Sequence, residues 1–172
     1  TAYTVGQAPL LAALDPFGLL LIEQPLPEED ILGHADLQQR ISTPICLDES
    51  ITSAKVAVDA VALGACRIVN VKAGRVGGYL EARRLHDACR PMGVPLRCGG
   101  MLETGIGRAA NVALSALPGF TLPSDVSGSD KYYARDVTTE PIVSAGGLVE
   151  VPVGVGDAEA LALLVQGLTA WH

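Results

Sequence analysis

The chain has 172 residues and a formal net charge of −7, and 49% of its residues are hydrophobic against 18% that are charged. This balance excludes a disordered or fibrous chain, and the acidic excess argues against nucleic acid or an anionic membrane as a partner. The apolar runs are too short to cross a membrane and the N-terminus lacks a signal-peptide pattern, so we expect a cytoplasmic protein with one core.

Short apolar runs recur along the chain, and each is followed by a helical pattern. A first helix is expected over about 5–14. The expected strands are then 19–23, 45–48, 68–72, 94–98 and 120–122. The helices expected after the first four strands are 27–40, 56–63 (capped by Ser50 or Thr52), 79–89 and 107–117. Beyond about residue 132 the pattern loosens into two β-like pieces, 142–144 and 148–151, and a last helix over 157–168.

The strand ends fall near residues 23, 48, 72, 98 and 124, an almost even spacing. Strands that alternate so regularly with helices predict a parallel α/β sheet, either an open doubly wound sheet or a (β/α) TIM barrel. Polar residues end every strand, which favours the barrel, because a barrel builds its site from all its strand ends. About five strand–helix units are present where a closed barrel needs eight. We therefore expect residues 1–172 to be an incomplete barrel, with 132–172 as a C-terminal extension.

The cysteines and histidines form no metal-binding or nucleophile pattern. The four cysteines show no CxxC spacing, so we expect reduced core residues of a cytosolic protein. They are Cys46, Cys66, Cys89 and Cys98. His34 and His86 fall in helical patterns, and we expect both to be exposed.

Glu23 and Asp48 end two consecutive predicted strands. On adjacent parallel strands their carboxylates would lie side by side and repel each other unless a cation bridges them. Mg²⁺ suits such a site, because it takes oxygen ligands and keeps some of its water. The alternative is that each carboxylate caps the following helix or pairs with an arginine.

Lys72 ends the third strand, within a run that otherwise resembles a buried strand. A lysine in a dry pocket can transfer protons as a base, or form a Schiff base with a carbonyl substrate. Alternatively, its ammonium extends from the strand end into solvent.

Two glycine-rich stretches follow strands. The stretch 74–78 lacks the spacing of a phosphate-binding loop. Gly99, Gly100 and Met101 would allow close approach of a ligand, or form a plain tight turn. Asp125, at the end of the last strand, is a candidate ligand, hydrogen-bonding group or cap.

Four ordered motifs resemble the enolase superfamily, muconate-lactonizing subgroup, and within it the o-succinylbenzoate synthases and N-acylamino acid (N-succinylamino acid) racemases. They are Ile22-Glu23-Gln24-Pro25, Cys46-Leu47-Asp48-Glu49-Ser50, Asn70-Val71-Lys72-Ala73-Gly74-Arg75-Val76-Gly77-Gly78 and Cys98-Gly99-Gly100-Met101-Leu102-Glu103-Thr104-Gly105. The resemblance extends through nearly the whole chain and implies the C-terminal portion of an enolase-type barrel.

The resemblance implies a site for Mg²⁺, or another divalent cation such as Mn²⁺, with carboxylates from three consecutive strands. Glu23 and Asp48 match the second and third ligands, and the first would precede Thr1. The family's Lys-x-Lys motif, whose last lysine faces Lys72 across the substrate, is absent from the sequence, as is the N-terminal capping domain. The resemblance thus implies that the chain alone is inactive.

The implied chemistry is removal of a proton α to a carboxylate of a small substrate, through an enediolate. Two lysines would act in racemization, whereas in o-succinylbenzoate synthesis, a dehydration of the menaquinone pathway, Lys72 would supply positive charge. Gly100 and Met101 match positions near the acyl end of the substrate, and Glu49 and Asn70 match positions that support the metal ligands.

The resemblance leaves other readings open. A dipeptide epimerase or cycloisomerase of the same superfamily would use the same groups. From a different class, the chain could be an inactive remnant or a partner subunit that completes a barrel with another polypeptide. When complete, the protein is expected to be a homo-oligomer.

Overall fold

The computed structural model describes residues 1–149, which form an α/β structure around a four-stranded parallel sheet. The strands are β1 (Ile22–Glu23), β2 (Ile45–Leu47), β3 (Ile68–Val71) and β4 (Leu96–Cys98). Each pairs in parallel with the next in the chain, so the strand order is β1-β2-β3-β4. An open doubly wound sheet reverses its strand order at a switch point, and this sheet has no such reversal.

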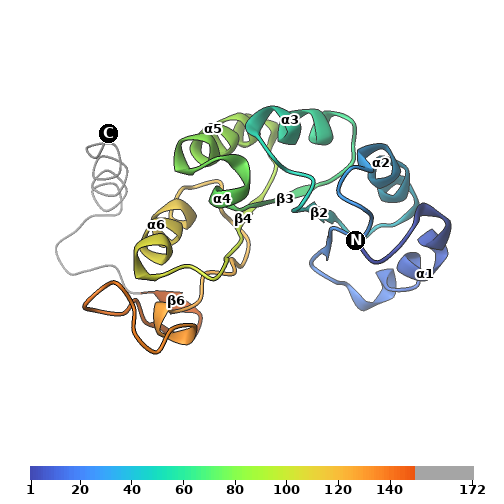
Figure 1. Cartoon of the computed structure of the whole chain (residues 1–172). Coiled ribbons are helices and arrows are strands. Elements are labelled where there is room, and N and C mark those ends of the chain that lie inside the picture. Colours follow the sequence, from blue (N-terminus) through green and yellow to red (C-terminus); the bar gives the residue numbers. More distant parts are fainter. Residues whose placement is uncertain (150–172) are drawn as a thin grey trace.

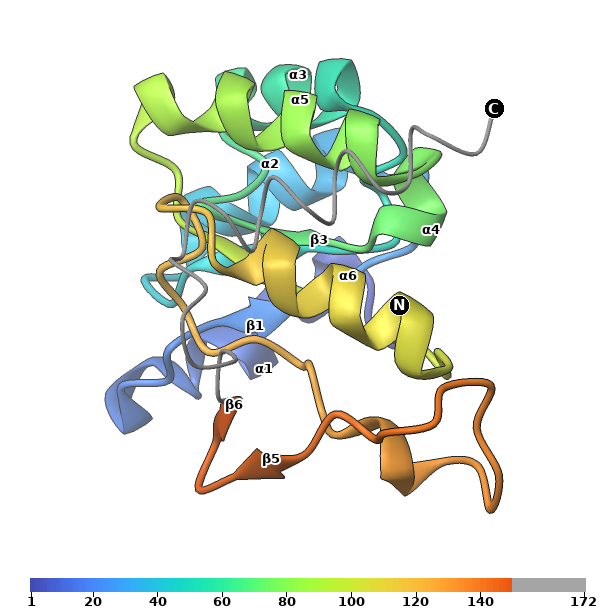
Figure 2. The same cartoon turned by 90° about the vertical axis from the view of Figure 1, so that its left-hand side faces the viewer.

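A helix follows each of these strands. The long helices are α2 (Ile31–Arg40), α3 (Ala54–Ala62), α5 (Tyr79–Cys89) and α6 (Gly105–Ser115), with short helices α1 (Ala8–Ala12) and α4 (Ala73–Val76). The long helices succeed one another in an arc outside the strands (Figure 1), and α3 and α5 lie side by side in both views (Figure 2). None of the helices within residues 1–149 has the length and apolar character needed to span a bilayer.

The N-terminal segment differs from the helix predicted over 5–14. It consists of a 3₁₀ turn (Val5–Gln7), the short α1, and a second 3₁₀ turn (Asp15–Phe17). Pro9 lies in the first turn of α1, where its missing N–H costs nothing, whereas inside a longer helix it would leave a carbonyl unpaired. The proline therefore sets where this helix begins.

Strand β1 is also shorter than the predicted 19–23, and Leu19 and Leu20 are 41% and 55% exposed. The Ile22 N–H donates to the Pro44 carbonyl, and Ile22 pairs with Ile45. The segment before Ile22 has no strand beside it within the described residues, so its backbone stays outside the sheet. Its apolar side chains are left at the open edge of β1.

The predicted fifth strand forms only an isolated parallel bridge between Phe120 and Leu96. Its segment continues alongside β4, since the Asp125 N–H donates to the Cys98 carbonyl at 2.8 Å. Further along, the two-residue strands β5 (Ser144–Ala145) and β6 (Leu148–Val149) form an antiparallel hairpin, where the sequence predicted β-like pieces over slightly different ranges. The helix predicted over 157–168 lies outside the described residues.

The termini of the long helices lie within two residues of the predicted ones, except that α2 begins at Ile31 instead of residue 27. Asp30 caps α2, because its carboxylate accepts the Gly33 N–H at 2.8 Å. The hydroxyl of Ser53, rather than Ser50 or Thr52, caps α3 by accepting the Val56 N–H at 3.2 Å. Helix α6 begins at Gly105, two residues earlier than predicted. Two further 3₁₀ turns, Arg90–Met92 and Ser129–Lys131, complete the described elements.

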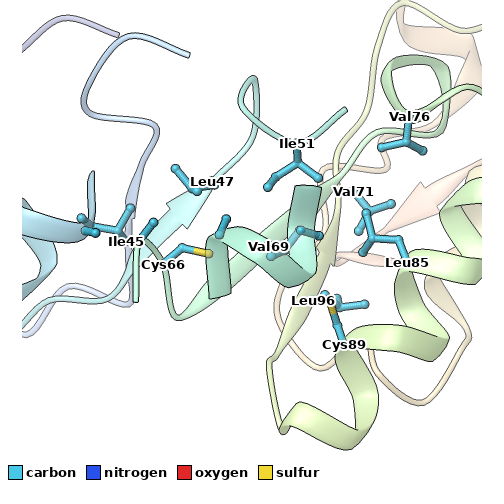
Figure 3. Packing of buried hydrophobic residues seen from close by; sticks show 14 of the residues in the cluster. Ile45, Leu47, Ile51, Cys66, Val69, Val71, Val76, Leu85, Cys89 and Leu96 are labelled. Carbon is cyan, nitrogen blue, oxygen red and sulfur yellow. The ribbon is translucent and has the colours of Figure 1, made fainter. Parts of the chain in front are cut away.

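The hydrophobic core joins the strands to the surrounding helices (Figure 3). Ile45, Leu47, Val69 and Val71 of the strands and Leu85 of α5 are fully buried. Close packing of these branched side chains supplies the main apolar burial of the fold.

The four cysteines are free and buried, as predicted. Burial raises the pKa of the Cys66 and Cys98 thiols to about 12. Because the thiolate is the reactive form, these side chains behave as small apolar residues.

The two helical histidines are buried, which contradicts the prediction that they are exposed. The His34 Nδ1–H donates to the Asp30 carbonyl at 2.7 Å, and its Nε2 accepts the Leu26 N–H at 3.2 Å. The His86 Nε2 accepts the Gly119 N–H at 3.0 Å, and its ring stacks on Phe120. A neutral imidazole with both nitrogens paired can be buried at little cost.

The buried His34 predicts a stability that depends on pH. Burial lowers the pKa of His34 below its usual 6.5, so between these two values the unfolded chain binds a proton that the folded chain does not. The contribution is complete above pH 6.5 and falls as the pH decreases toward the folded pKa. Urea unfolding from pH 8 to pH 5 should show this loss, and His34→Gln should flatten the curve in that range; an equal slope in both proteins would contradict it.

Candidate active site

Lys72 and Asp48 meet at the carboxyl ends of β3 and β2. The Lys72 Nζ donates to Asp48 Oδ2 at 2.7 Å, and the Arg75 guanidinium pairs with the other oxygen, Asp48 Oδ1. Asp48 is only 1% exposed, and the Lys72 side chain 16%. A carboxylate this deeply buried requires such cationic partners, because desolvation of an unpaired charge costs several kcal/mol or more.

Glu23 is held by two side chains from more distant strands. Its Oε1 accepts the Asn70 Nδ2–H at 3.0 Å, and its Oε2 pairs with Arg97 Nη1 at 2.7 Å. Asn70 of β3 and Arg97 of β4 are partners in the sheet register, so both extend from one level of the sheet to Glu23. The Glu23 side chain is one-third exposed, and its carboxylate therefore faces the open mouth of the sheet.

The carboxylates of Glu23 and Asp48 are of the chemical kind that Mg²⁺ binds. Glu23 also lines a shallow pocket together with Thr1, Gln24 and Glu49. Within residues 1–149, however, no three acidic, histidine or cysteine side chains lie close enough together to hold a metal ion. The two carboxylates fit such a site in kind but supply fewer ligands than it needs, and both also contact an arginine, as the alternative interpretation anticipated.

Gly99 leaves room for the side chain of Lys72. A Cβ at this position would lie 2.6 Å from both Asn70 Oδ1 and Lys72 Cγ. Only a hydrogen fits there, so the glycine allows the stem of Lys72 to lie against the end of β4 on its way to Asp48.

The loop that follows carries the predicted substrate-contacting residues. Gly100 lies so close to the Asp125 carbonyl that a side chain would collide with it, whereas Met101 is 54% exposed. The Met101 N–H donates to Glu103 Oε1 at 2.7 Å, and its carbonyl accepts the Arg108 Nη2–H at 3.0 Å. Glu103 and Arg108 thus hold the backbone of the loop, while the methionine side chain extends into solvent.

The sequence analysis did not single out Arg75, Arg97, Arg108 or Gln24. The sequence does mark Arg97, because it stands within a predicted buried strand, where a charged side chain needs a partner of opposite charge. Arg75 lies in the glycine-rich stretch 74–78 and in the third motif of the resemblance, and neither pattern points to Asp48 as its partner. Arg108 is fully buried in α6 and pairs with Glu103, and nothing in its helical pattern marks that.

A parallel sheet with outer helices and with acidic and basic side chains at its strand ends is the architecture of barrel enzymes that do acid–base chemistry there. The chain belongs to the enolase C-terminal domain-like family, whose profile matches residues 1–157. It is 68% identical over 156 residues to an N-succinylamino acid racemase of an Amycolatopsis species, covering 91% of this chain and 42% of that protein. An o-succinylbenzoate synthase of Geobacillus stearothermophilus is 53% identical over 156 residues, which again cover 91% of this chain and 42% of that protein.

Solved structures agree with this assignment. A protein from Enterococcus faecalis V583 described as an unknown member of the enolase superfamily superposes with a TM-score of 0.84 at 40% identity, covering 96% of this chain and 45% of that one. A dipeptide epimerase of the same organism, solved with Mg and a dipeptide, has a TM-score of 0.68 at 30% identity over 73% of this chain and 36% of that one. The chain thus spans less than half the length of these relatives, in agreement with the C-terminal part of a barrel.

Gly99→Ala tests the close passage of Lys72. The added methyl must displace Lys72 or Asn70, so we expect a loss of about 1–3 kcal/mol in unfolding free energy, as for other overpacked sites. Gly74→Ala is the matched control, since its Cβ would meet nothing within 4 Å. Denaturant unfolding measures both variants, and equal midpoints would contradict the crowding at Gly99.

Proposed function

We propose that this chain supplies Lys72 as a proton-transfer group, and Glu23 and Asp48 as ligands of Mg²⁺ or Mn²⁺, for removal of a proton α to a carboxylate. The reaction would be that of an N-succinylamino acid racemase, an o-succinylbenzoate synthase, or both. The contact between the Lys72 ammonium and the buried Asp48 carboxylate at neighbouring strand ends carries this proposal. The names of the two similar relatives support the substrate class.

The divalent cation, when bound, supplies positive charge opposite the negative charge that develops on the substrate carboxylate. Glu23 and Asp48 would hold it from the ends of β1 and β2. Asn70 and Arg97 bind the Glu23 carboxylate from the side of β3 and β4, which limits its rotation. A further carboxylate would have to come from outside residues 1–149.

Lys72 would move the proton. Asp48 holds its Nζ at the mouth of the sheet, and its stem passes close to Gly99. In its neutral form Lys72 would accept the α-proton on one face of the substrate, and as an ammonium it would return one. Racemization also needs a second group on the opposite face, whereas in dehydration the ammonium of Lys72 would stabilise charge.

The loop at Gly100 and Met101 would receive the acyl end of the substrate. Met101 presents an exposed, adaptable apolar side chain, while the Arg108 contact holds its backbone. The substrate proposed here is therefore a small carboxylate with an apolar or acyl extension.

Substitution of Lys72 tests its role. The chain would be co-expressed with the N-terminal remainder of the Amycolatopsis racemase, and turnover of N-succinylamino acids and α-proton exchange in D₂O would be measured. Lys72→Ala should lower racemization by about 10²-fold or more, the usual contribution of a general base. Lys72→Arg should restore no racemization, because a guanidinium stays protonated, but should retain part of a dehydration that needs only charge.

Lys55→Ala is the control for this experiment, because the side chain of Lys55 on α3 is 81% exposed and pairs only with Asp59. Unchanged rates in Lys72→Ala would remove Lys72 from its role. Turnover of dipeptides in place of both acyl substrates would favour the epimerase alternative.

Asp48→Asn tests the metal site by affinity rather than by rate. We expect weaker Mg²⁺ binding by about tenfold or more, since even residues behind a metal ligand contribute that much. Asp59→Asn, on the exposed face of α3, is the control. Calorimetric titration of the co-expressed complex measures this, and equal affinities would exclude Asp48 as a ligand.

The absence of three clustered metal ligands in residues 1–149 favours a second possibility, in which this chain acts only as a partner subunit. We expect no measurable turnover from the 172-residue chain by itself. Activity of the purified chain alone, at the rate of the co-expressed complex, would contradict this.

A further inference from the structure

Gln24, directly after Glu23 at the end of β1, has an unusual backbone. Its φ is +38°, and among residues 1–149 it is the only non-glycine residue with a positive φ. It is also 3% exposed. A non-glycine residue persists in such a conformation only where its surroundings hold it there.

The Gln24 N–H donates to the Cys46 carbonyl at 2.8 Å, and the side-chain amide of Gln24 adds a further hold. Its Oε1 accepts the Asp48 N–H at 2.9 Å and the Ser50 N–H at 3.3 Å. Its Nε2 donates to Ser50 Oγ at 2.7 Å and to the Leu26 carbonyl at 3.3 Å. The amide therefore bridges the end of β1 and the loop that follows β2.

A second layer of hydrogen bonds surrounds this bridge. The Ser50 hydroxyl donates to the Glu28 carbonyl at 2.7 Å, which ties the loop after β2 to the segment before α2. The ring of His34 lies behind, with Nε2 3.4 Å from Gln24 Nε2. These hydrogen bonds are buried or partly buried, where the low local dielectric makes them stronger than in water.

We propose that Gln24 is a positioning residue that sets the relative placement of the Glu23 and Asp48 carboxylates, and thereby the divalent-metal affinity of the site. The left-handed turn at Gln24 directs the chain immediately after Glu23, and its amide oxygen anchors the main-chain N–H of Asp48. One side chain thus couples two carboxylates that stand on different strands. This inference rests on the proposed metal site.

The coupling of the two carboxylates should affect Mg²⁺ affinity in particular. The ion requires near-ideal octahedral geometry with short ligand distances, so small changes in the spacing of two carboxylates reduce its affinity. If the amide only stabilised the core, its removal would lower the stability of the fold and leave the metal affinity of the folded protein unchanged.

Gln38 offers a matched control. It is 4% exposed, and its Oε1 accepts the Ile45 N–H at 2.7 Å while its Nε2 donates to the Thr43 carbonyl at 3.2 Å. This second buried amide therefore anchors β2 at its opposite end, away from the carboxylates. Gln38→Met and Gln24→Met make the same chemical change at the two ends of one strand.

The experiment measures Mn²⁺ affinity by electron paramagnetic resonance in the co-expressed complex, together with thermal unfolding. Both methionine variants should lose stability. Only Gln24→Met should weaken Mn²⁺ binding, by about tenfold or more, and saturating Mn²⁺ should restore most of its kcat. Equal Mn²⁺ affinities in Gln24→Met and Gln38→Met would overturn the inference.

Gln24→Asn keeps the inference testable if Gln24→Met does not fold. Asparagine tolerates a positive φ but is one methylene shorter, so it preserves the turn and withdraws the amide from the Asp48 N–H. It should weaken Mn²⁺ binding as well, and wild-type affinity would overturn the inference. Asp48→Asn, measured alongside, separates failure of the proposed metal site from failure of the role of Gln24. If Asp48→Asn also keeps full Mn²⁺ affinity, the metal site itself is refuted. If only Asp48→Asn loses affinity, the role of Gln24 alone is refuted.

Discussion

The burial of the Asp48 carboxylate is the constraint on which the rest of the site depends. A charge with 1% exposure must be compensated, and here Lys72 and Arg75 each take one of its oxygens. Parallel pairing of β2 with β3 brings the lysine to it, and Gly99 at the end of β4 leaves room for the lysine stem. Three strands therefore cooperate to hold one ion pair, and their neighbouring positions in the sheet bring the groups together.

The sequence alone was sufficient to predict the repeating strand–helix units. The alternation of apolar runs and helical patterns located β1 to β4 and their helices, and the charges that end three strands pointed to Glu23, Asp48 and Lys72. Their placement follows from parallel topology alone, because carboxyl ends of parallel strands meet on one side. The family and its relatives agree with the resemblance drawn from the motifs around these residues.

What the sequence did not reveal depends on long-range partners. His34 and His86 are buried with their Nε2 atoms accepting the N–H groups of Leu26 and Gly119, which lie outside their own helices, and helical periodicity carries no sign of those partners. The positive φ and the amide contacts of Gln24 do not show in the sequence, because both depend on the folded loop after β2. The short β1 and the single bridge at Phe120 show that strand length depends on the neighbouring strand as well as on the apolar run.

The contrast between Gly99 and the loop after it has an evolutionary consequence. No substitution at Gly99 is sterically neutral, because any side chain meets Asn70 and Lys72. Two and three residues later, Met101 and Leu102 are 54% and 69% exposed, so their side chains face solvent. Side-chain changes at Met101 and Leu102 can therefore arise without crowding the Lys72–Asp48 ion pair, whereas any side chain added at Gly99 collides with the lysine stem.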